Sequence, residues 1–300
     1  MNTDNLKNLD EKTREEIEAL LKITREKDGD KEFAQAQYML GQIFILNNEV
    51  KKAIDVWKNI QRLDDPEGYS VANMQIGEFL YQNENFKGAI EAWKKIKQED
   101  YPKVYFLVKV RISDIFVRQG DNNKALLILY SIRKLDDLSA YASAQLKIGY
   151  ILKDMYNYEK ALKYWSEIKP EYGTNIYGIA QLETAEILRI KGELDSSLNV
   201  LEKIKDSPQK NIKSLVDLKT GQVFRGKGNL KKACDVWQEI KQDQNPYVYA
   251  MAKVEIGKVL KEIGDIDGAI IVWNDFSKED NPEVHSVTRL LVADAFIEKN

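Results

Sequence analysis

The sequence predicts an all-α fold: a right-handed α-solenoid, or superhelix, of about seven helix-turn-helix repeats with a capping helix at each end, about 16 helices in all. The first observation behind this prediction is the spacing of the tryptophans, which differ by 36, 72, 72 and 36 residues. They are Trp57, Trp93, Trp165, Trp237 and Trp273. The second observation is that three further columns of residues keep the same period.

These columns pass through seven units without slipping by one residue. Where the tryptophan column lacks tryptophan it holds Leu129 and Leu201. Three residues later stands an isoleucine in six units and Phe276 in the seventh. Four residues before the tryptophan column lies a small residue: Ala53, Ala89, Ala125, Ala161, Ser197, Ala233 and Ala269. Further upstream runs a column of mostly glycine: Gly41, Gly77, Ser113, Gly149, Ala185, Gly221 and Gly257.

Each unit predicts two helices. In the first unit, apolar residues recur at helical spacing over 33–46 and again over about 51–61. We expect Gly41 to let the two helix backbones approach, and each tryptophan to fill space between units. Between the helices lies a residue suited to the left-handed conformation that ends a helix: Asn48, Gly120, Gly192, Gly228 or Gly264. The next residue is mostly one that can cap the second helix: Glu49, Asn85, Asp121, Asn157, Glu193, Asn229 and Asp265.

The chain divides into three expected segments of one continuous solenoid. These are an N-terminal tail and capping helix at 1–31, seven repeats at 32–281 and a C-terminal capping helix at 282–300. Asp65-Pro66, Asn245-Pro246 and Asn281-Pro282 mark starts of first helices, because proline is favoured at the first helical position.

The two end helices are expected to be polar on their outer faces, as the ends of a solenoid require. The N-terminal one begins with a capping-box pattern at Thr13 and Glu16 and resembles a lone second helix, with Ile17 and Leu21 in phase. The C-terminal one resembles a lone first helix. Its residues in phase are Leu290, Val292, Ala293 and Phe296.

Composition excludes several classes of protein. The chain has 45 Lys and Arg against 48 Asp and Glu, a net charge of −3, which gives no net attraction to nucleic acid or to an anionic membrane. One histidine and one cysteine cannot build a His/Cys zinc site or an internal disulfide. No apolar run approaches the roughly 20 residues of a membrane span, and the N-terminus lacks the apolar stretch of a signal peptide. We therefore expect a cytoplasmic protein.

The repeat resembles the tetratricopeptide repeat family over roughly residues 13–300. Leu40-Gly41, Phe44, Ala53 and Trp57 follow the family's order of small and large residues on two antiparallel helices. Three departures stand out: the unit is 36 residues long rather than about 34, the last small position holds Ile60, and the family's first-helix tryptophan position is polar. That polar position holds Gln37, Asn73 and Lys109. Sel1-like repeats have a similar length, but their loop between helices is usually longer.

The candidates for catalysis are better explained as structure. His285 replaces tyrosine in a column that opens each first helix, and Cys234 occupies an apolar column of the second helices. The tyrosine column itself (Phe33, Tyr69, Tyr105, Tyr141, Tyr177, Lys213 and Tyr249) is interpreted as packing between consecutive units. Acidic pairs recur at the turns between units and are interpreted as helix caps: Asp64-Asp65, Asp136-Asp137 and Glu279-Asp280. Gly226-Lys227-Gly228 lacks the rest of a phosphate loop, so we expect no enzyme, no cofactor and no metal.

The resemblance implies that the first helices line a concave face that binds an extended peptide or a partner domain. Projected onto this chain, that face contains side chains that change from unit to unit, where binding specificity can reside. The candidate partner-binding residues are Gln42, Glu78, Tyr81, Arg111, Asp114, Arg118, Lys147, Tyr150, Lys153, Glu186, Arg189 and Arg225. Their charges are mixed, which favours a protein partner over nucleic acid.

We therefore predict a protein-protein interaction scaffold or adaptor that binds a peptide or partner domain, with arginines pairing partner carboxylates. One specific version is a bacterial inhibitor or immunity-type protein that neutralises a toxin. Another alternative is an RNA-binding helical repeat in the pentatricopeptide manner, which would need a basic inner face. The oligomeric state is open, and a monomer is compatible with the sequence.

Units five and six depart from the pattern. Thr184 and Thr220 replace apolar residues, Ser197 replaces alanine and Lys213 replaces tyrosine. We hypothesise a weaker joint there, which hydrogen exchange across residues 176–230 would test.

Overall fold

A computed structural model describes residues 10–275 and 281–299. These residues form α-helices, one short 3₁₀ helix and turns, with no strand among them. The chain divides into two compact units, Met1–Ile151 and Leu152–Asn300, with the boundary inside one helix. The all-α helical-hairpin prediction is confirmed.

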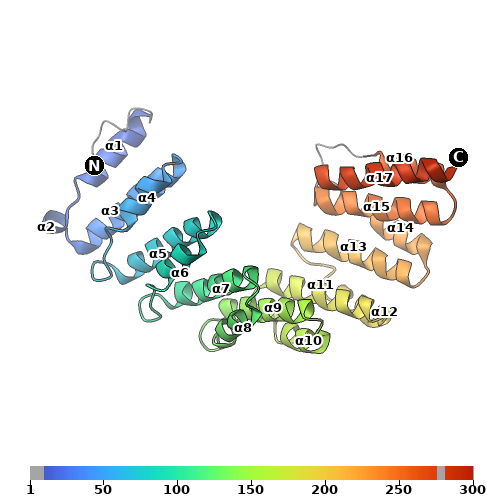
Figure 1. The fold of residues 1–300 in the computed structure, drawn as a ribbon, viewed down its shortest axis with the longest axis horizontal. Coiled ribbons are helices and arrows are strands. Elements are labelled where there is room, and N and C mark those ends of the chain that lie inside the picture. Colours follow the sequence, from blue (N-terminus) through green and yellow to red (C-terminus); the bar gives the residue numbers. More distant parts are fainter. Residues whose placement is uncertain (1–9, 276–280, 300) are drawn as a thin grey trace. The chain divides into compact units, whose positions relative to one another are not determined.

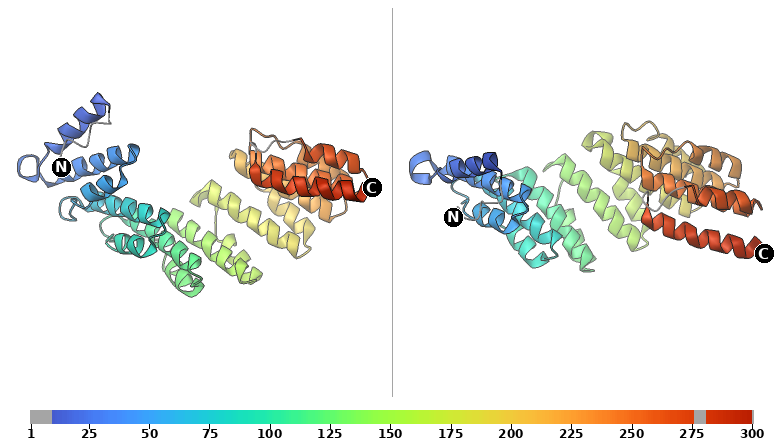
Figure 2. Two further views of the ribbon diagram at one scale, coloured as in Figure 1. Left: turned by 45° about the horizontal axis from the view of Figure 1, so that its top comes forward. Right: turned by 90° about the horizontal axis from the view of Figure 1, so that it is seen from above.

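The first unit contains three long-and-short hairpins after two N-terminal helices (Figures 1 and 2). The N-terminal helices are α1 (Glu11–Leu21) and α2 (Arg25–Asp28). The hairpins are α3 (Asp30–Leu46) with α4 (Val50–Trp57), α5 (Pro66–Gln82) with α6 (Phe86–Trp93), and α7 (Pro102–Arg118) with α8 (Asn122–Tyr130). Helix α9 (Leu138–Asp154) begins in this unit. Consecutive first helices pack together, α3 on α5 and α5 on α7.

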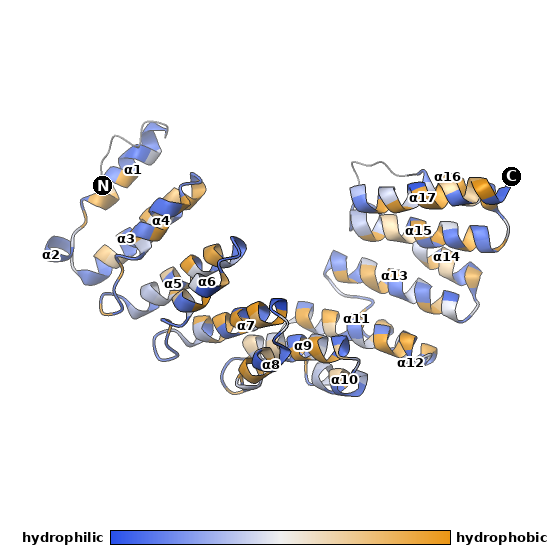
Figure 3. Cartoon of the chain, viewed as in Figure 1, coloured by the Kyte–Doolittle hydropathy of each residue, from blue (hydrophilic) through white to orange (hydrophobic). Residues whose placement is uncertain are grey.

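The second unit continues the alternation. After α9 come α10 (Tyr158–Ser166) and the 3₁₀ helix η2 (Pro170–Tyr172). The hairpins that follow are α11 (Thr174–Ile190) with α12 (Leu194–Glu202), α13 (Lys210–Gly226) with α14 (Leu230–Gln238), and α15 (Pro246–Glu262) with α16 (Ile266–Trp273). Helix α17 (Pro282–Lys299) packs on α15 and α16. Figure 3 shows polar and apolar residues alternating along these helices, as amphipathic packing requires.

The turn inside every hairpin has the same geometry, and it extends the sequence prediction. The predicted positions have positive φ, and so do Glu84 and Tyr156, at 58° and 57°. In each turn the residue after the left-handed one donates its backbone N–H to a carbonyl five residues earlier, as Asn85 does to Leu80 at 2.8 Å. This is the Schellman arrangement that closes a helix C-terminus.

The caps of the second helices are confirmed where the side chain is short enough. Asn85, Asp121, Asn157, Asn229 and Asp265 each accept a hydrogen bond from the backbone N–H three residues later. Glu49 and Glu193 occupy the same position without a side-chain cap. One residue therefore ends one helix and begins the next in these five hairpins, which keeps the turn short.

The glycine column accommodates the tryptophan side chain, and this differs from the close backbone approach that we expected. A Cβ added at Gly221 would lie under 3.0 Å from Nε1 of Trp237, and the same holds for the glycine and tryptophan of three other hairpins. These tryptophans are buried, and each indole N–H donates to a carbonyl 19 residues earlier on its own first helix, at 2.9–3.2 Å. The two hairpins with leucine in place of tryptophan have Ser113 and Ala185 in place of glycine.

The two ends of the chain differ from expectation. The side chain of Asp10 caps α1 by accepting from the Thr13 backbone N–H at 2.9 Å, so Thr13 is not the cap. The additional four-residue helix α2 brings the α-helices of the described residues to seventeen, against about 16 predicted.

Helix α17 is not polar on its outer face. Val292 is buried as expected, but Leu290, Ala293 and Phe296 are exposed. Among the described residues, α17 has no second helix of its own packed on this face. The buried residues of α17 are Val284, Thr288, Val292 and Ala295.

The polar replacements in units five and six have hydrogen-bond partners. The Thr184 hydroxyl donates to the carbonyl of Ala180 and the Ser197 hydroxyl to the carbonyl of Ala185, both at 2.8 Å. Leu182, Leu201, Ile212 and Val216 form one apolar cluster across α11, α12 and α13. The hinge hypothesis stays a prediction, for which hydrogen exchange remains the measurement.

Candidate functional site

The predicted partner-binding residues all lie on first helices, and Tyr81 also contacts the second helix α6, with its ring centroid 5.7 Å from that of Phe86 and 6.0 Å from that of Trp93. In the first unit they belong to α3, α5, α7 and α9, and in the second unit to α9, α11 and α13. Arg111 and Arg118 are exposed, and the other ten are half-buried. We call this surface, in each unit separately, the first-helix face.

Ion pairs connect consecutive first helices on this face in the first unit. Arg111 of α7 lies 3.4 Å from the carboxylate of Glu78 on α5. Lys147 of α9 pairs with Asp114 of α7. In both cases a base in one repeat pairs with the acid 33 residues earlier, so the repeat places acid and base in register.

The second unit has the same kind of pairing. Lys219 of α13 lies 3.1 Å from Glu186 of α11, which keeps the spacing of 33 residues. Two further pairs reach forward instead, from Lys153 to Glu183 at 2.5 Å and from Arg225 to Glu255 at 2.9 Å. We call these five inter-helix pairs of the two units the charge ladder. Most charged side chains among the predicted partner-binding residues therefore have an ion-pair partner within the protein. A partner that binds Arg111 or Arg225 has to compete with an internal carboxylate.

Glu186 is the most strongly perturbed acid of this face. Burial acts to raise its pKa, but the hydrogen bond from Arg189 and the positive charges of Lys219 and Arg189 outweigh it and lower the pKa to about 2. Arg189 donates two hydrogen bonds to the carboxylate, at 2.6 and 3.1 Å. This carboxylate is therefore a structural anion at neutral pH rather than a general acid.

Arg118 and Tyr81 lie outside the charge ladder and close to one another. Arg118 lies over the ring of Tyr81, with its guanidinium carbon 4.9 Å from the ring centroid. Within residues 10–275 and 281–299, Arg118 makes no ion pair. Gln42, on α3, also lies outside the ladder. Arg118 is therefore an accessible cation for a partner carboxylate.

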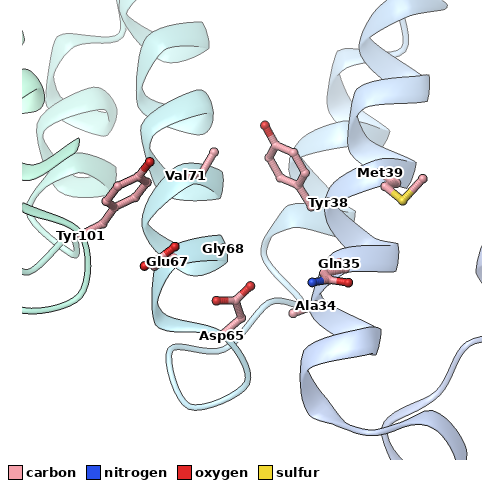
Figure 4. A pocket seen from close by; sticks show the side chains of 9 residues that line it. All are labelled: Ala34, Gln35, Tyr38, Met39, Asp65, Glu67, Gly68, Val71 and Tyr101. Atoms are coloured by element: carbon pink, nitrogen blue, oxygen red, sulfur yellow. The ribbon is translucent and has the colours of Figure 1, made fainter. Parts of the chain in front are cut away.

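A groove of about 480 Å³ lies between α3 and α5 in the first unit (Figure 4). Tyr38 and Met39 contribute from α3, Val71 from α5, and Tyr101 from the turn before α7. The remaining lining residues are Ala34, Gln35, Asp65, Glu67 and Gly68. Sequence reasoning missed this groove, since none of its residues was among the predicted partner-binding set.

A second, polar recess of about 460 Å³ lies in the second unit, lined by residues of α11, α13 and α15. It brings together the predicted residues Arg189 and Arg225 with Glu255 and Glu262. Arg225 donates to both of these glutamates, at 2.9 and 3.1 Å. The positive charge of Arg225 in this recess is therefore already paired with carboxylates of the protein.

The structural interpretation of His285 and Cys234 agrees with their positions. His285 lies half-buried in the first turn of α17, and Cys234 packs against the core cluster around Trp237. Burial and the charge of Asp235 raise the pKa of the Cys234 thiol, and Arg225 opposes them, which makes it a weak nucleophile at neutral pH.

Of the acidic pairs predicted to be helix caps, the described residues show a side-chain cap only at Asp137, and the side chain of Asp65 does not cap α5. Asp64 and Asp136 each accept from the backbone N–H three residues earlier, at 2.9 Å. Asp137 caps α9 by accepting from the Ala140 N–H at 2.7 Å. Glu279-Asp280 lies outside the described residues. The described part of the chain holds no group of three metal-ligating side chains.

The tyrosine column packs between consecutive repeats, as predicted. Tyr69 of α5 packs against the cluster that contains Trp57 and Ile60, and Tyr249 of α15 against the one that contains Trp237 and Ile240. Among the described carboxyls Asp217 has a raised pKa, caused by burial and by Glu239 against the opposing charge of Lys213. A cluster of such carboxyls, which acid–base catalysis would need, is not formed in the described residues.

Comparison with known proteins bears on the fold. No family model and no curated protein matches the chain. It is similar to the solved structure of a tetratricopeptide repeat protein from Parabacteroides merdae, with a TM-score of 0.54 and 14% identity over 85% of this chain and 98% of that one. It is also similar to the MamA protein, with a TM-score of 0.43 and 20% identity over 56% of this chain and 88% of that one. No helix among the described residues is long and apolar enough to cross a membrane. The chain thus has the fold of the tetratricopeptide repeat proteins.

Proposed function

We propose that the protein is an interaction scaffold that binds a partner protein or peptide on its first-helix face, and that it is not an enzyme. The seven repeats of residues 32–281 would form the binding module, with 1–31 and 282–300 as its ends. The observation that carries the proposal is the contrast between repeated and non-repeated positions. The tryptophan, glycine and isoleucine columns recur because they pack, while the exposed first-helix positions change from repeat to repeat.

The accessible part of this face in the first unit directs the experiment. Arg118 and Gln42 are predicted site residues outside the charge ladder, so changing their charge leaves the inter-helix ion pairs intact. The double variant Gln42→Arg/Arg118→Glu is compared with wild type by affinity purification and mass spectrometry. A partner that binds this face is expected to be lost from the variant.

The matched control introduces the same changes of charge on second helices of the first unit. Asn123→Arg/Lys87→Glu alters one exposed residue of α8 and one of α6, and neither makes an ion pair within the part of the chain that is described. Retention of the partner by both variants would contradict the proposal for this face. Loss by both would point to a general effect of surface charge.

RNA binding is the alternative that this experiment can also test. The charge ladder neutralises most bases of the first-helix face, so a basic track for phosphates is not supported. RNA that is retained at low salt and released steeply with rising salt, with no protein captured, would favour RNA binding over the proposed protein binding. A toxin domain among the captured proteins would instead identify the inhibitor alternative. A cytoplasmic location is part of the proposal and is tested by cell fractionation.

A further inference from the structure

The groove between α3 and α5 lies where the other repeats carry a side chain that α5 lacks. The first turn of each later first helix carries a residue with a side chain at the position of Gly68: Val104, Ala140, Ile176, Ile212, Val248 and Val284. Val104, Ile212, Val248 and Val284 are at most 6% exposed. In α5 this position is glycine, and the carboxylate of Asp65 lies 2.5 Å from the place that its Cβ would take. The groove opens beside these two residues.

The place of the missing side chain is seen in the second unit. Ile212 of α13 packs over Gly178 of α11, where a Cβ added to the glycine would lie 3.1 Å from Cγ2 of the isoleucine. Gly178 corresponds to Ala34 in the repeat, and Ile212 corresponds to Gly68. Ala34 and Gly68 both line the groove. The groove therefore lacks one branched aliphatic side chain between two first helices.

The rim of the groove adds two requirements on an occupant. Tyr38, Met39, Val71 and Tyr101 give it an apolar wall, and Met39 is 47% exposed (Figure 4). Asp65 and Glu67 lie at the end of the groove where α5 begins. Within residues 10–275 and 281–299 neither carboxylate makes an ion pair or accepts a side-chain hydrogen bond, unlike the carboxylates of the charge ladder. The groove thus offers an apolar space beside two unmatched negative charges.

We propose that this groove binds an extended segment of a partner protein that carries a branched aliphatic side chain, such as leucine or isoleucine, next to a lysine or arginine. The aliphatic side chain lies in the groove beside Gly68 and Val71, and the basic side chain pairs with Glu67 or Asp65. This inference rests on the proposed scaffold function and gives its partner a chemistry. One anchor and one charge pair support a weak contact, with a Kd on the order of 1 mM for an isolated short peptide.

The test uses the full chain labelled with nitrogen-15 and a capped hexapeptide probe, Gly-Ser-Leu-Lys-Ser-Gly, followed by NMR. The shifts are expected around Tyr38, Val71 and Tyr101. Replacing leucine by alanine or lysine by glutamate in the probe should each weaken binding at least fivefold. Equal binding of the glutamate probe would overturn the charge assignment, and shifts outside the groove would overturn the site.

The decisive variant is Gly68→Val, which introduces the side chain that α7 and α15 already have at this position. It should reduce binding of the probe at least tenfold while the urea midpoint stays the same or rises, because valine is a better helix residue than glycine and fills the space. Only the flexible carboxylate of Asp65 has to move to admit it. Unchanged probe binding by a folded Gly68→Val protein would refute the inference. Glu67→Lys should likewise weaken binding of the lysine-containing probe, and Glu91→Lys on α6 is its matched control, which should leave probe binding unchanged.

Deletion of residues 1–9, which contain Leu6-Lys7, tests the chain's own N-terminus as an occupant. Tighter probe binding after deletion of residues 1–9 would replace the partner segment by this one. The inference and the scaffold function fail separately. A partner that is lost with Gln42→Arg/Arg118→Glu but retained by Gly68→Val refutes the groove alone, whereas probe binding in the groove without any captured partner refutes the scaffold.

Discussion

The dependence of tryptophan on glycine in each hairpin can be tested by exchanging one hairpin's pair for that of another. In the α13–α14 hairpin, Gly221 faces the indole of Trp237, which is 1% exposed. In the α7–α8 hairpin the same two positions hold Ser113 and Leu129, both fully buried. The Ser113 hydroxyl donates to the carbonyl of Val110 at 2.6 Å, so serine satisfies its polar group locally.

The single changes should each be costly. Gly221→Ser places a Cβ under 3.0 Å from Nε1 of the indole, and such overpacking costs about 2 kcal/mol or more. Trp237→Leu leaves a cavity and removes the 2.9 Å hydrogen bond to the carbonyl of Leu218, which together cost about 3 kcal/mol. The double variant restores the α7–α8 pair, because the serine then occupies space that the indole has vacated. It should cost about 1–2 kcal/mol instead of about 5, a coupling of about 3 kcal/mol.

The assay is native-state hydrogen exchange of α13 and α14 in the two single variants, the double variant and wild type. Exchange is preferred to one global unfolding curve because repeat arrays often lose two-state behaviour. Gly226→Ser on the same helix is the control, since a Cβ there would only reach ordinary contact with Leu194 at 3.6 Å, and it should change little. If the loss of stability in the double variant equals the sum of the losses in the two single variants, the indole does not require the glycine.

Three further predictions follow from the turns and the charge ladder. Glu84→Gly should stabilise the protein by about 0.5–1 kcal/mol and Gly120→Ala should destabilise it by about 1 kcal/mol, because both residues have positive φ. Nothing lies within 4 Å of the Gly120 Cβ position, so the effect of alanine there is due to backbone strain alone. Urea midpoints measure both changes, and midpoints equal to that of the wild type would disprove the strain. The pKa of Glu186 is lowered from an ordinary 4.5 to about 2, so its contribution to stability is complete above about pH 4.5 and is lost as the pH falls towards 2. Glu186→Gln should therefore flatten that part of the curve of unfolding free energy against pH. A curve that keeps its slope in the variant would contradict this. Asp114→Asn should cost about 0.5 kcal/mol of stability at low salt and almost nothing at 1 M salt, because salt screens its pair with Lys147. The control is Asp195→Asn, which should cost nearly nothing at both salt concentrations, because the Asp195 carboxylate is 85% exposed. A salt-independent loss of stability in Asp114→Asn would argue against an ionic contribution.

The repeat made the fold predictable, and its limits are seen at particular residues. Left-handed turns were predicted where the sequence holds asparagine or glycine, but Glu84 and Tyr156 adopt the same conformation. Their residue types do not favour positive φ, so the hairpin geometry imposes it. Residue type therefore predicts positive φ at asparagine and glycine, whereas at Glu84 and Tyr156 the positive φ follows from the packing of the two helices.

The candidate site was less predictable, because it depends on how helices are placed beside each other. The columns showed alternating charges, but the pairing of Lys219 with Glu186 needs the register of two neighbouring helices, which no rule within one helix supplies. The exposure of Phe296 has a similar origin, since residues of the same column are buried or half-buried in the described hairpins, where a second helix is present. Periodicity predicts which residues are equivalent, whereas burial also depends on what lies next to them.

A repeat protein carries its specific information where one position departs from its column, and the departures here are of two kinds. Thr184 and Ser197 replace apolar or small residues and satisfy their hydroxyls within their own repeats, so these departures are compensated. At Gly68 an aliphatic side chain is absent, and only the flexible carboxylate of Asp65 lies in its place. Loss of an apolar side chain between two helices costs stability. Because this departure lies in a surface groove beside two carboxylates without ion-pair partners, we propose a binding role for it and not for Thr184 or Ser197.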